Sequence, residues 1–311
     1  MKSSKMDSRF AFKQHLVSSW HRQSGVIRGI FLMCLATIAF AIMHALVRYV
    51  SSDLHPFQIA FFRNVFGLLF LVPLIIQSRF ELFRSRRIGL HAVRGLVNIA
   101  AMLMFFMALS MTPLAKVTAL SFTAPIFMAI LSILVLGERF RFHRWFAIFA
   151  GFLGMLVVLR PGFVANDMGA LLAVGSAALW AFAMLLIKLL SRTESSVTIV
   201  AWMGIFLCVF SIGPALWVWQ PLTNETLILL TFIGLTGSIA QISLSQSLKE
   251  TDPTAVMPFD YLKIIWTALL GYWFFSETPD IYTWIGATVI FSSGIYIALR
   301  EKRSANRMTH E

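Results

Sequence analysis

Ten apolar segments of about 20 residues, joined by very short connections, constrain this chain more than any other feature. A helix of about 20 residues rises 1.5 Å per residue and spans the ~30 Å hydrocarbon core of a bilayer. Each segment is therefore predicted to cross a membrane, and the short connections make successive spans antiparallel neighbours. The predicted spans are 27–47, 57–77, 90–110, 114–136, 143–160, 169–190, 197–219, 226–248, 254–275 and 281–299.

The composition agrees with a membrane-embedded, all-α protein. Hydrophobic residues make up 58% of the chain and charged residues 13%, whereas soluble domains average about 45–50% and about 25%. A soluble globular fold is thereby excluded. The two cysteines, Cys34 and Cys208, lie in apolar runs and are predicted to be small buried hydrophobes. No metal site, cofactor or catalytic group is predicted.

The net charge of +12 does not indicate nucleic acid as a partner, because the basic residues lie in the short connections between spans. If both termini are cytoplasmic, 20 of the 26 Lys and Arg residues lie on the inner side and three on the outer side. This asymmetry is typical of a multi-pass membrane protein with an even number of spans and cytoplasmic termini.

The two halves of the chain resemble each other when one is shifted by 139–140 residues. Gly29 then falls on Gly169, and Thr112, Phe122 and Glu138 fall on Thr251, Tyr261 and Glu277. Five spans per half is an odd number, so the second copy is predicted to be inverted, as in secondary transporters that bind solute between their halves. The alternative is an old duplication retained for the fold alone. The predicted organisation is an N-terminal tail (1–25), a first five-helix repeat (26–160), a linker (161–168), a second five-helix repeat (169–300) and a C-terminal tail (301–311).

Several motifs carry a resemblance to a known family. They are Leu54-His-Pro-Phe-Gln-Ile-Ala-Phe-Phe-Arg63, Arg94-Gly95, Ser121-Phe-Thr-Ala-Pro-Ile-Phe127 and Leu136-Gly-Glu-Arg139. Over residues 27–300 the chain resembles EamA-type members of the drug/metabolite transporter superfamily, and its pattern is similar to that of bacterial riboflavin and S-adenosylmethionine permeases. The resemblance implies ten helices around a central cavity that opens alternately to each side. The predicted partners are a small-molecule metabolite and the lipid bilayer.

Asp260 and Lys263 lie near the middle of span 254–275, and Arg63 lies about 9 Å from the outer end of its own span. Charge at membrane depth is costly and marks a functional site by default. Asp260 and Lys263 are predicted to line the cavity, although a pair that only neutralises itself is the alternative. Arg63 is predicted to present its planar guanidinium to a substrate, with extension toward the interface as the alternative.

Uncharged side chains complete the predicted substrate site. Asn98 and Gln241 offer amide groups at useful depth, with helix linking as the alternative. The rings of Phe122, Trp180 and Tyr261 would suit a flat or cationic solute. His44 is expected to reach the interface.

A second set of residues is predicted to act at hinges or gates. Pro125 and Pro258 would bend spans 114–136 and 254–275, Glu138 and Glu277 would end them, and Arg94 would stabilise an inner gate or extend toward the interface. Small residues in spans 143–160 and 281–299 favour close packing, within the bundle or in a homodimer.

The leading prediction is a carrier of a small organic metabolite, with riboflavin or a similar ring-bearing compound favoured. The alternatives are S-adenosylmethionine or amino acids, efflux included. The chain contains no Gly-x-x-x-x-Gly-Lys-Ser/Thr motif, so direct ATP coupling is not expected. A membrane-embedded enzyme would need clustered catalytic groups, and the seven histidines are scattered. A receptor or scaffold is disfavoured by the duplicated architecture.

Overall fold

The computed structural model describes residues 24–77, 85, 87–136, 142–159, 167–191, 193–194, 196–251, 256 and 259–308. Within these ranges the chain forms helices joined by turns and contains no strand. The helices are α2 (Gly25–Val50), α3 (Pro56–Gln77), α4 (Ile88–Met111), α5 (Leu114–Ser121), α6 (Ala124–Leu136), α7 (Phe142–Leu159), α8 (Met168–Leu190), α9 (Ser196–Trp217), α10 (Asn224–Glu250), α12 (Leu262–Phe275) and α13 (Ile281–Met308).

Eight of the predicted spans each fall largely on one helix, whereas 114–136 is divided between α5 and α6, and the described part of 254–275 contains α12. Five helical stretches are long and apolar enough to cross a membrane by length and composition, and five shorter apolar helices fall on the remaining predicted spans. The helix α13 continues to Met308, beyond the predicted end of its span at residue 299. All but the last two residues of the predicted N-terminal tail, and most of the linker, lie outside the described residues.

Local chemistry explains where several helices begin. The side chains of Ser24, Asp167 and Thr223 accept hydrogen bonds from backbone N–H groups in the first turns of α2, α8 and α10. Such N-caps satisfy donors that have no partner within the helix. The helix α4 ends before Thr112-Pro113, and α5 begins directly after this proline.

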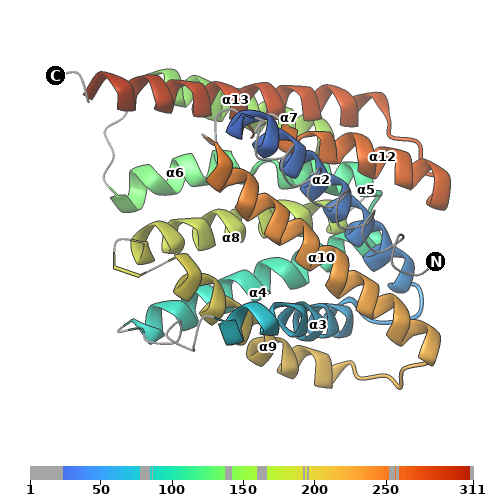
Figure 1. Cartoon of the computed structure of the whole chain (residues 1–311). Helices are drawn as coiled ribbons and strands as arrows, with labels where there is room; N and C mark the ends of the chain where they lie inside the picture. The colour runs from blue at the N-terminus through green and yellow to red at the C-terminus, as the bar shows by residue number, and fades with distance from the viewer. Residues whose placement is uncertain are drawn as a thin grey trace, which may run out of the picture.

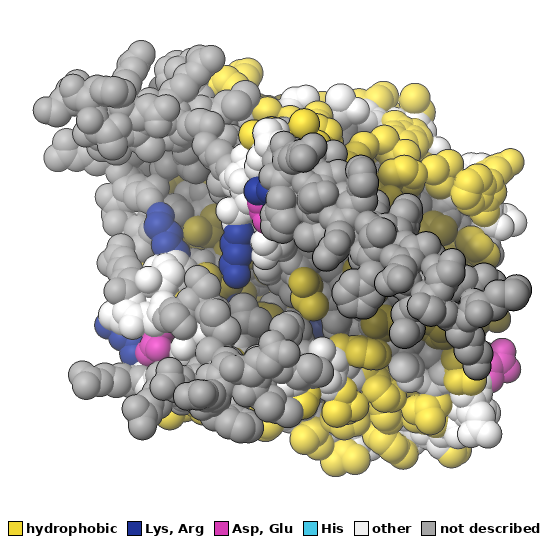
Figure 2. Space-filling model, viewed as in Figure 1, with side chains coloured by type: hydrophobic (Ala, Val, Ile, Leu, Met, Phe, Trp, Pro, Cys, Tyr) yellow, Lys and Arg dark blue, Asp and Glu magenta, His cyan; other side chains and the backbone are white. Residues whose placement is uncertain are grey.

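Much of the outer surface of the bundle is apolar. Figure 2 shows hydrophobic side chains over much of the described surface. Phe146, Trp217 and Phe274 are each more than 60% exposed. In water such a surface would promote aggregation, whereas in a bilayer it is the lipid-facing side.

The two halves contact each other in two equivalent ways. The first helix of one half packs against the third helix of the other: α2 lies on α10, and α8 lies on α4. The helices α7 and α13 pair along one edge of the bundle, and α3 and α9 pair along the opposite edge (Figure 1). The equivalent pairs show that the sequence duplication is also a duplication of packing.

The close approach of these helices depends on glycines. A Cβ atom on Gly29 would overlap the side chain of Thr251, and one on Gly169 would overlap the side chain of Thr112. These are the residues that the repeat alignment matches.

The small residues of α7 and α13 are used within the chain. A Cβ on Gly154 would lie 3.0 Å from the carbonyl oxygen of Gly286, and one on Gly286 would overlap Val158. These residues therefore support the bundle, and a homodimer stays a prediction.

Candidate functional site

Asp260 and Lys263 form an ion pair at an interruption in the ninth predicted span. Lys263 Nζ lies 3.6 Å from Asp260 Oδ1, and the two side chains are 13% and 19% exposed. The sequence pattern suggested one continuous helix through both residues. The structure instead has a turn at Tyr261, and α12 begins at Leu262. Asp260 is the only acidic residue inside any predicted span, so this pair is chemically distinct from its surroundings.

The fourth predicted span is interrupted at the equivalent place. The helix α5 ends at Ser121, Phe122 and Thr123 form a turn, and α6 begins at Ala124. Pro125 lies in the first turn of α6, where its missing N–H costs no helical hydrogen bond. The interruption fits the predicted bend, while movement about Pro125 stays a prediction.

Aromatic rings from both halves meet at these two interruptions. The rings of Phe122 and Tyr261 stack with centroids 4.5 Å apart. Lys263 Nζ lies 4.8 Å from the Phe122 centroid and 5.6 Å from that of Phe40, within the range of cation–π attraction. Tyr261 also meets the edge of Phe291 at 4.1 Å. We call Phe40, Phe122, Asp260, Tyr261 and Lys263 the central cluster.

His44 lies beside the central cluster, which the sequence did not indicate. It is 6% exposed, so the expectation that it reaches the interface is wrong. Its ring contacts Phe105 at 4.9 Å, and it lies within the electrostatic reach of both Lys263 and Arg63. Its Nδ1 atom is buried and has no hydrogen-bond partner within the described residues. A lone histidine in an apolar span carries no motif that could have revealed this placement.

Arg63 is held by a short chain of contacts from α3 to α9. Its Nη1 donates to Asn64 Oδ1 at 3.1 Å, and Asn64 Nδ2 donates to the Leu207 carbonyl oxygen at 3.4 Å. The guanidinium lies against Gly237 of α10, where an added Cβ would come within 3.3 Å of Nε. The structure thus brings Arg63, His44 and Lys263 into one electrostatic neighbourhood.

The remaining predicted substrate residues form no hydrogen bond, ion pair or ring contact with the central cluster. Asn98 on α4 and Gln241 on α10 are partly buried, and their amides make no hydrogen bond to another described residue. Trp180 on α8 is 40% exposed. Their roles in binding stay predictions.

Arg94 is a helix-linking residue in this structure. It is 4% exposed, which excludes extension of its side chain into the interface. Its Nη1 donates to the Ile199 carbonyl oxygen at 2.8 Å, and its Nη2 contacts Met203 Sδ at 3.1 Å. These contacts tie α4 to α9, and a role in gating stays a prediction. Pro258 and Glu138 lie outside the described residues.

Arg48 and Glu277 join both halves at the end of the bundle where α2 and α4 finish. The two side chains form an ion pair, and Arg48 Nη1 also donates to the carbonyl oxygens of Leu109 and Thr112, each at 2.7 Å. Glu277 Oε2 accepts from the Leu114 backbone N–H at 2.9 Å, so Glu277 caps α5 rather than its own helix. We call this region the Arg48 end.

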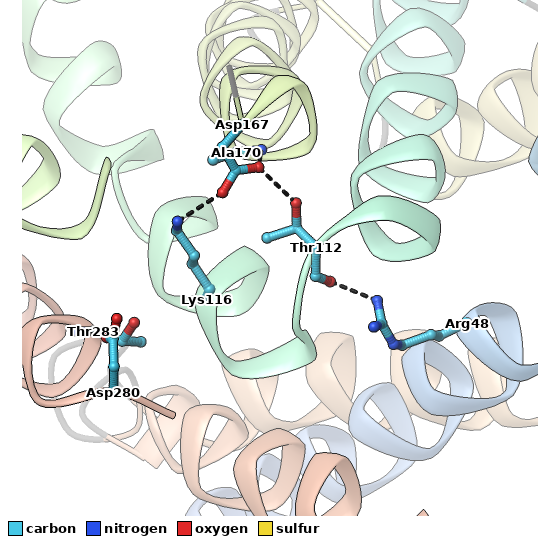
Figure 3. Close-up of polar contacts among 7 residues, drawn as sticks. All are labelled: Arg48, Thr112, Lys116, Asp167, Ala170, Asp280 and Thr283. Carbon is cyan, nitrogen blue, oxygen red and sulfur yellow. Dashed lines mark hydrogen bonds and ion pairs between the residues drawn. The ribbon is translucent and has the colours of Figure 1, made fainter. Parts of the chain in front are cut away.

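Asp167 adds a second contact between the halves at the Arg48 end (Figure 3). Its carboxylate accepts from Lys116 Nζ at 2.7 Å and from Thr112 Oγ1 at 2.9 Å. Burial raises the pKa of Asp167, but hydrogen bonds from Lys116, the Ala170 N–H and Thr112 outweigh that effect and hold the pKa below its ordinary value.

The Arg48 end also contains a cavity of about 230 Å³, lined by Lys116, Thr267, Glu277, Asp280 and Thr283 among others. None of the residues that line this cavity belongs to the central cluster. The candidate site is therefore defined by the charged groups and rings of the central cluster and not by this cavity. Within the described residues no three His, Cys, Asp or Glu side chains are arranged to hold a metal.

Comparison with known proteins identifies the class of protein. Two segments, residues 27–160 and 167–299, each match the EamA-like transporter family. The chain belongs to this family, and the resemblance drawn from its motifs is confirmed. It is a multi-pass membrane protein, and its duplicated sequence follows from the two matches.

Curated relatives agree with that class. The chain is 30% identical to an S-adenosylmethionine uptake transporter of Rickettsia bellii (90% of this chain, 96% of the relative) and 31% identical to a riboflavin transporter of Rhizobium johnstonii (90% and 94%). It is 29% identical to a pseudopaline exporter of Pseudomonas aeruginosa (88% and 97%). A crystal structure with 17% identity superposes with a TM-score of 0.59, covering 90% of this chain and 98% of the other, and supports the fold alone.

Proposed function

We propose that this chain is a secondary transporter that moves a small ring-bearing metabolite across the bacterial inner membrane. The relatives named above transport or export small metabolites, and they support the class of substrate. In this proposal ten helices form two inverted five-helix repeats around a central cavity, with both termini cytoplasmic. The exchanged contacts between α2 and α10 and between α8 and α4 support this architecture.

The observation that carries the proposal is the central cluster. An ion pair and stacked rings meet where two spans are interrupted, and one ring comes from each half. Interrupted helices at the junction of two repeats are a recurring form of solute site in secondary transporters. Rocking of the halves about these interruptions would expose the cluster to each side in turn.

The central cluster can engage a solute in two ways. The faces of Phe122 and Tyr261 suit a flat ring, and the long Asp260–Lys263 contact can open when a polar group of the solute takes one partner. Riboflavin is a ring compound of this kind and is the favoured substrate. S-adenosylmethionine or an amino acid is the alternative, and the exporter among the relatives keeps efflux open.

The test is uptake into proteoliposomes with labelled riboflavin, S-adenosylmethionine and a set of amino acids. Wild type should transport at least one solute above protein-free vesicles. Asp260→Asn and Lys263→Met should each slow its initial rate by at least about tenfold, which corresponds to about 1.4 kcal/mol. The control is Lys249→Met, which removes an exposed lysine of α10. Unchanged transport in both central variants would refute the proposed site.

A further inference from the structure

Arg63 is a cation inside a predicted span that no described acid compensates. It lies seven residues after the start of α3 and is partly buried. Within the described residues, Arg63 forms no ion pair, and its one hydrogen bond is the contact with Asn64. Holding a guanidinium at membrane depth without a counter-charge is costly, so this position has to be explained by something other than stability.

Two other cations inside predicted spans, Lys263 and Arg94, have partners that offset their charge or use their donors. Lys263 lies beside Asp260, and Arg94 donates to the Ile199 carbonyl oxygen. A guanidinium carries five N–H donors in a rigid fork, and Arg63 uses one nitrogen for Asn64. It therefore retains more unused donors within the described residues than either of these two cations.

The surroundings of Arg63 hold the guanidinium in place and leave most of its donors unused, and Gly237 allows it to lie close to α10. Asn64 is 4% exposed and is itself bound to the Leu207 carbonyl oxygen, so it orients the guanidinium. Gly237 contributes no side chain where α10 passes the Nε and Nη2 atoms. A preoriented guanidinium with unused N–H donors is the group that binds a carboxylate through two parallel hydrogen bonds.

The charge balance points to the same ligand. Arg63 and Lys263 both lie close enough to His44 to interact with it electrostatically. Among the described residues, Asp260 is the acid that forms an ion pair here, and its partner is Lys263. Two cations and one carboxylate leave one positive charge in excess. The buried Nδ1 of His44 adds a polar atom without a described partner.

We propose that Arg63 binds a carboxylate of the transported metabolite. This inference moves the preference from riboflavin, the substrate favoured above, to the alternative class of ring-bearing acids and amino acids. This inference rests on the proposed transport function and narrows its substrate. The ring of the solute lies on Phe122 and Tyr261, and its carboxylate lies on Arg63. Of the solutes named for the relatives above, S-adenosylmethionine has an amino-acid carboxylate, whereas riboflavin has none.

The experiment measures equilibrium binding to the purified full-length protein with matched solutes that differ by one carboxylate. The pairs are S-adenosylmethionine with its decarboxylated form, and phenylalanine with phenethylamine. In wild type, the acid of at least one pair should bind at least about tenfold more tightly than its partner. Arg63→Gln should reduce that ratio to about one, mainly by weakening the acid.

Two further variants separate binding from folding. Arg63→Lys keeps the charge but loses the two-pronged geometry and should give an intermediate ratio. Arg28→Gln removes an arginine that pairs with Glu250 at the far end of α2 and should leave the ratio unchanged. Size-exclusion profiles verify that each variant is folded.

Several outcomes would overturn the inference: equal affinities within each pair in wild type, a ratio that persists in Arg63→Gln, or no binding by any member of either pair. Riboflavin uptake by the same preparation would then show that the transport proposal survives without the carboxylate site. No uptake of any solute by wild type would refute the transport proposal itself.

Discussion

Two regions of the molecule differ in how closely they follow the internal repeat. The first is the set of helix contacts between the halves, and the second is the centre of the bundle. At the first, Gly29 of α2 packs on Thr251, and Gly169 of α8 packs on Thr112. At the second, Asp260 and Lys263 correspond to Ser121 and Ala124, which carry no charge. The stacked pair Phe122 and Tyr261 lies between these extremes, because both halves contribute a ring but only one contributes a hydroxyl.

This difference separates scaffold from selectivity. Features present in both halves, such as the glycine contacts, are sufficiently explained by helix packing. A charge pair present in one half cannot be required by the shared architecture, because the other half folds without it. The features shared by both halves therefore belong to the framework, and we infer that the charged pair, which the first half lacks, serves selectivity.

The largest predicted effect on stability concerns the Arg48 end. Arg48→Ala would leave Glu277 without its cation and two helix-end carbonyls without their donor. We expect a loss of about 2–3 kcal/mol in the free energy of unfolding. Breaking a fully buried ion pair costs about 3–5 kcal/mol, and the expected loss is smaller because both side chains are partly exposed. Thermal unfolding in detergent measures this effect. Lys249→Ala is the control, and equal stability of the two variants would show that the Arg48 contacts hold nothing together.

The glycine contacts give a direct test of equivalence between the halves. Gly29→Ala and Gly169→Ala each force a methyl group into a threonine of the other half. Each should reduce stability by about 1–3 kcal/mol. Gly89→Ala is the matched control, because a Cβ there meets nothing within 4 Å. A loss in one half only would break the proposed equivalence of the two interfaces.

The smallest predicted effect is the pH dependence that comes from Asp167. Because its folded pKa is held below the ordinary value of about 3.9, its contribution to stability is present above that pH and is lost as pH falls through the folded pKa. Wild type should therefore exceed Asp167→Asn in thermal midpoint by a constant margin from pH 8 to about pH 5. Below about pH 4 the margin should shrink. A margin independent of pH down to pH 3 would contradict this role.

The fold was largely predictable from the sequence, because bilayer thickness fixes the length of each apolar segment. The repeat positions Gly29, Gly169, Thr112 and Thr251 were also visible, because the same packing problem is solved twice. The partners of buried polar groups were not predictable. Arg94 meets a backbone carbonyl of α9, and a carbonyl has no signature in the sequence.

The candidate site was only partly predictable from the sequence. Asp260 and Lys263 are neighbours along the chain, so their pairing follows from spacing. His44 enters the neighbourhood through packing between distant helices, which no local pattern records. The interruption at Tyr261 was hidden because a turn of this kind needs no glycine or proline at the turn itself.

The central claim is that the Asp260–Lys263 pair contacts the transported solute and does more than neutralise itself. The most direct test is the exchange variant Asp260→Lys with Lys263→Asp, which keeps one charge of each sign at the same two positions. The measurement is its initial uptake rate in proteoliposomes, with the solute that wild type transports and at matched protein content. We predict a rate at least about tenfold below wild type with a thermal midpoint close to that of wild type. Transport at the wild-type rate would contradict the account, because it would show that mutual neutralisation is all that the pair provides.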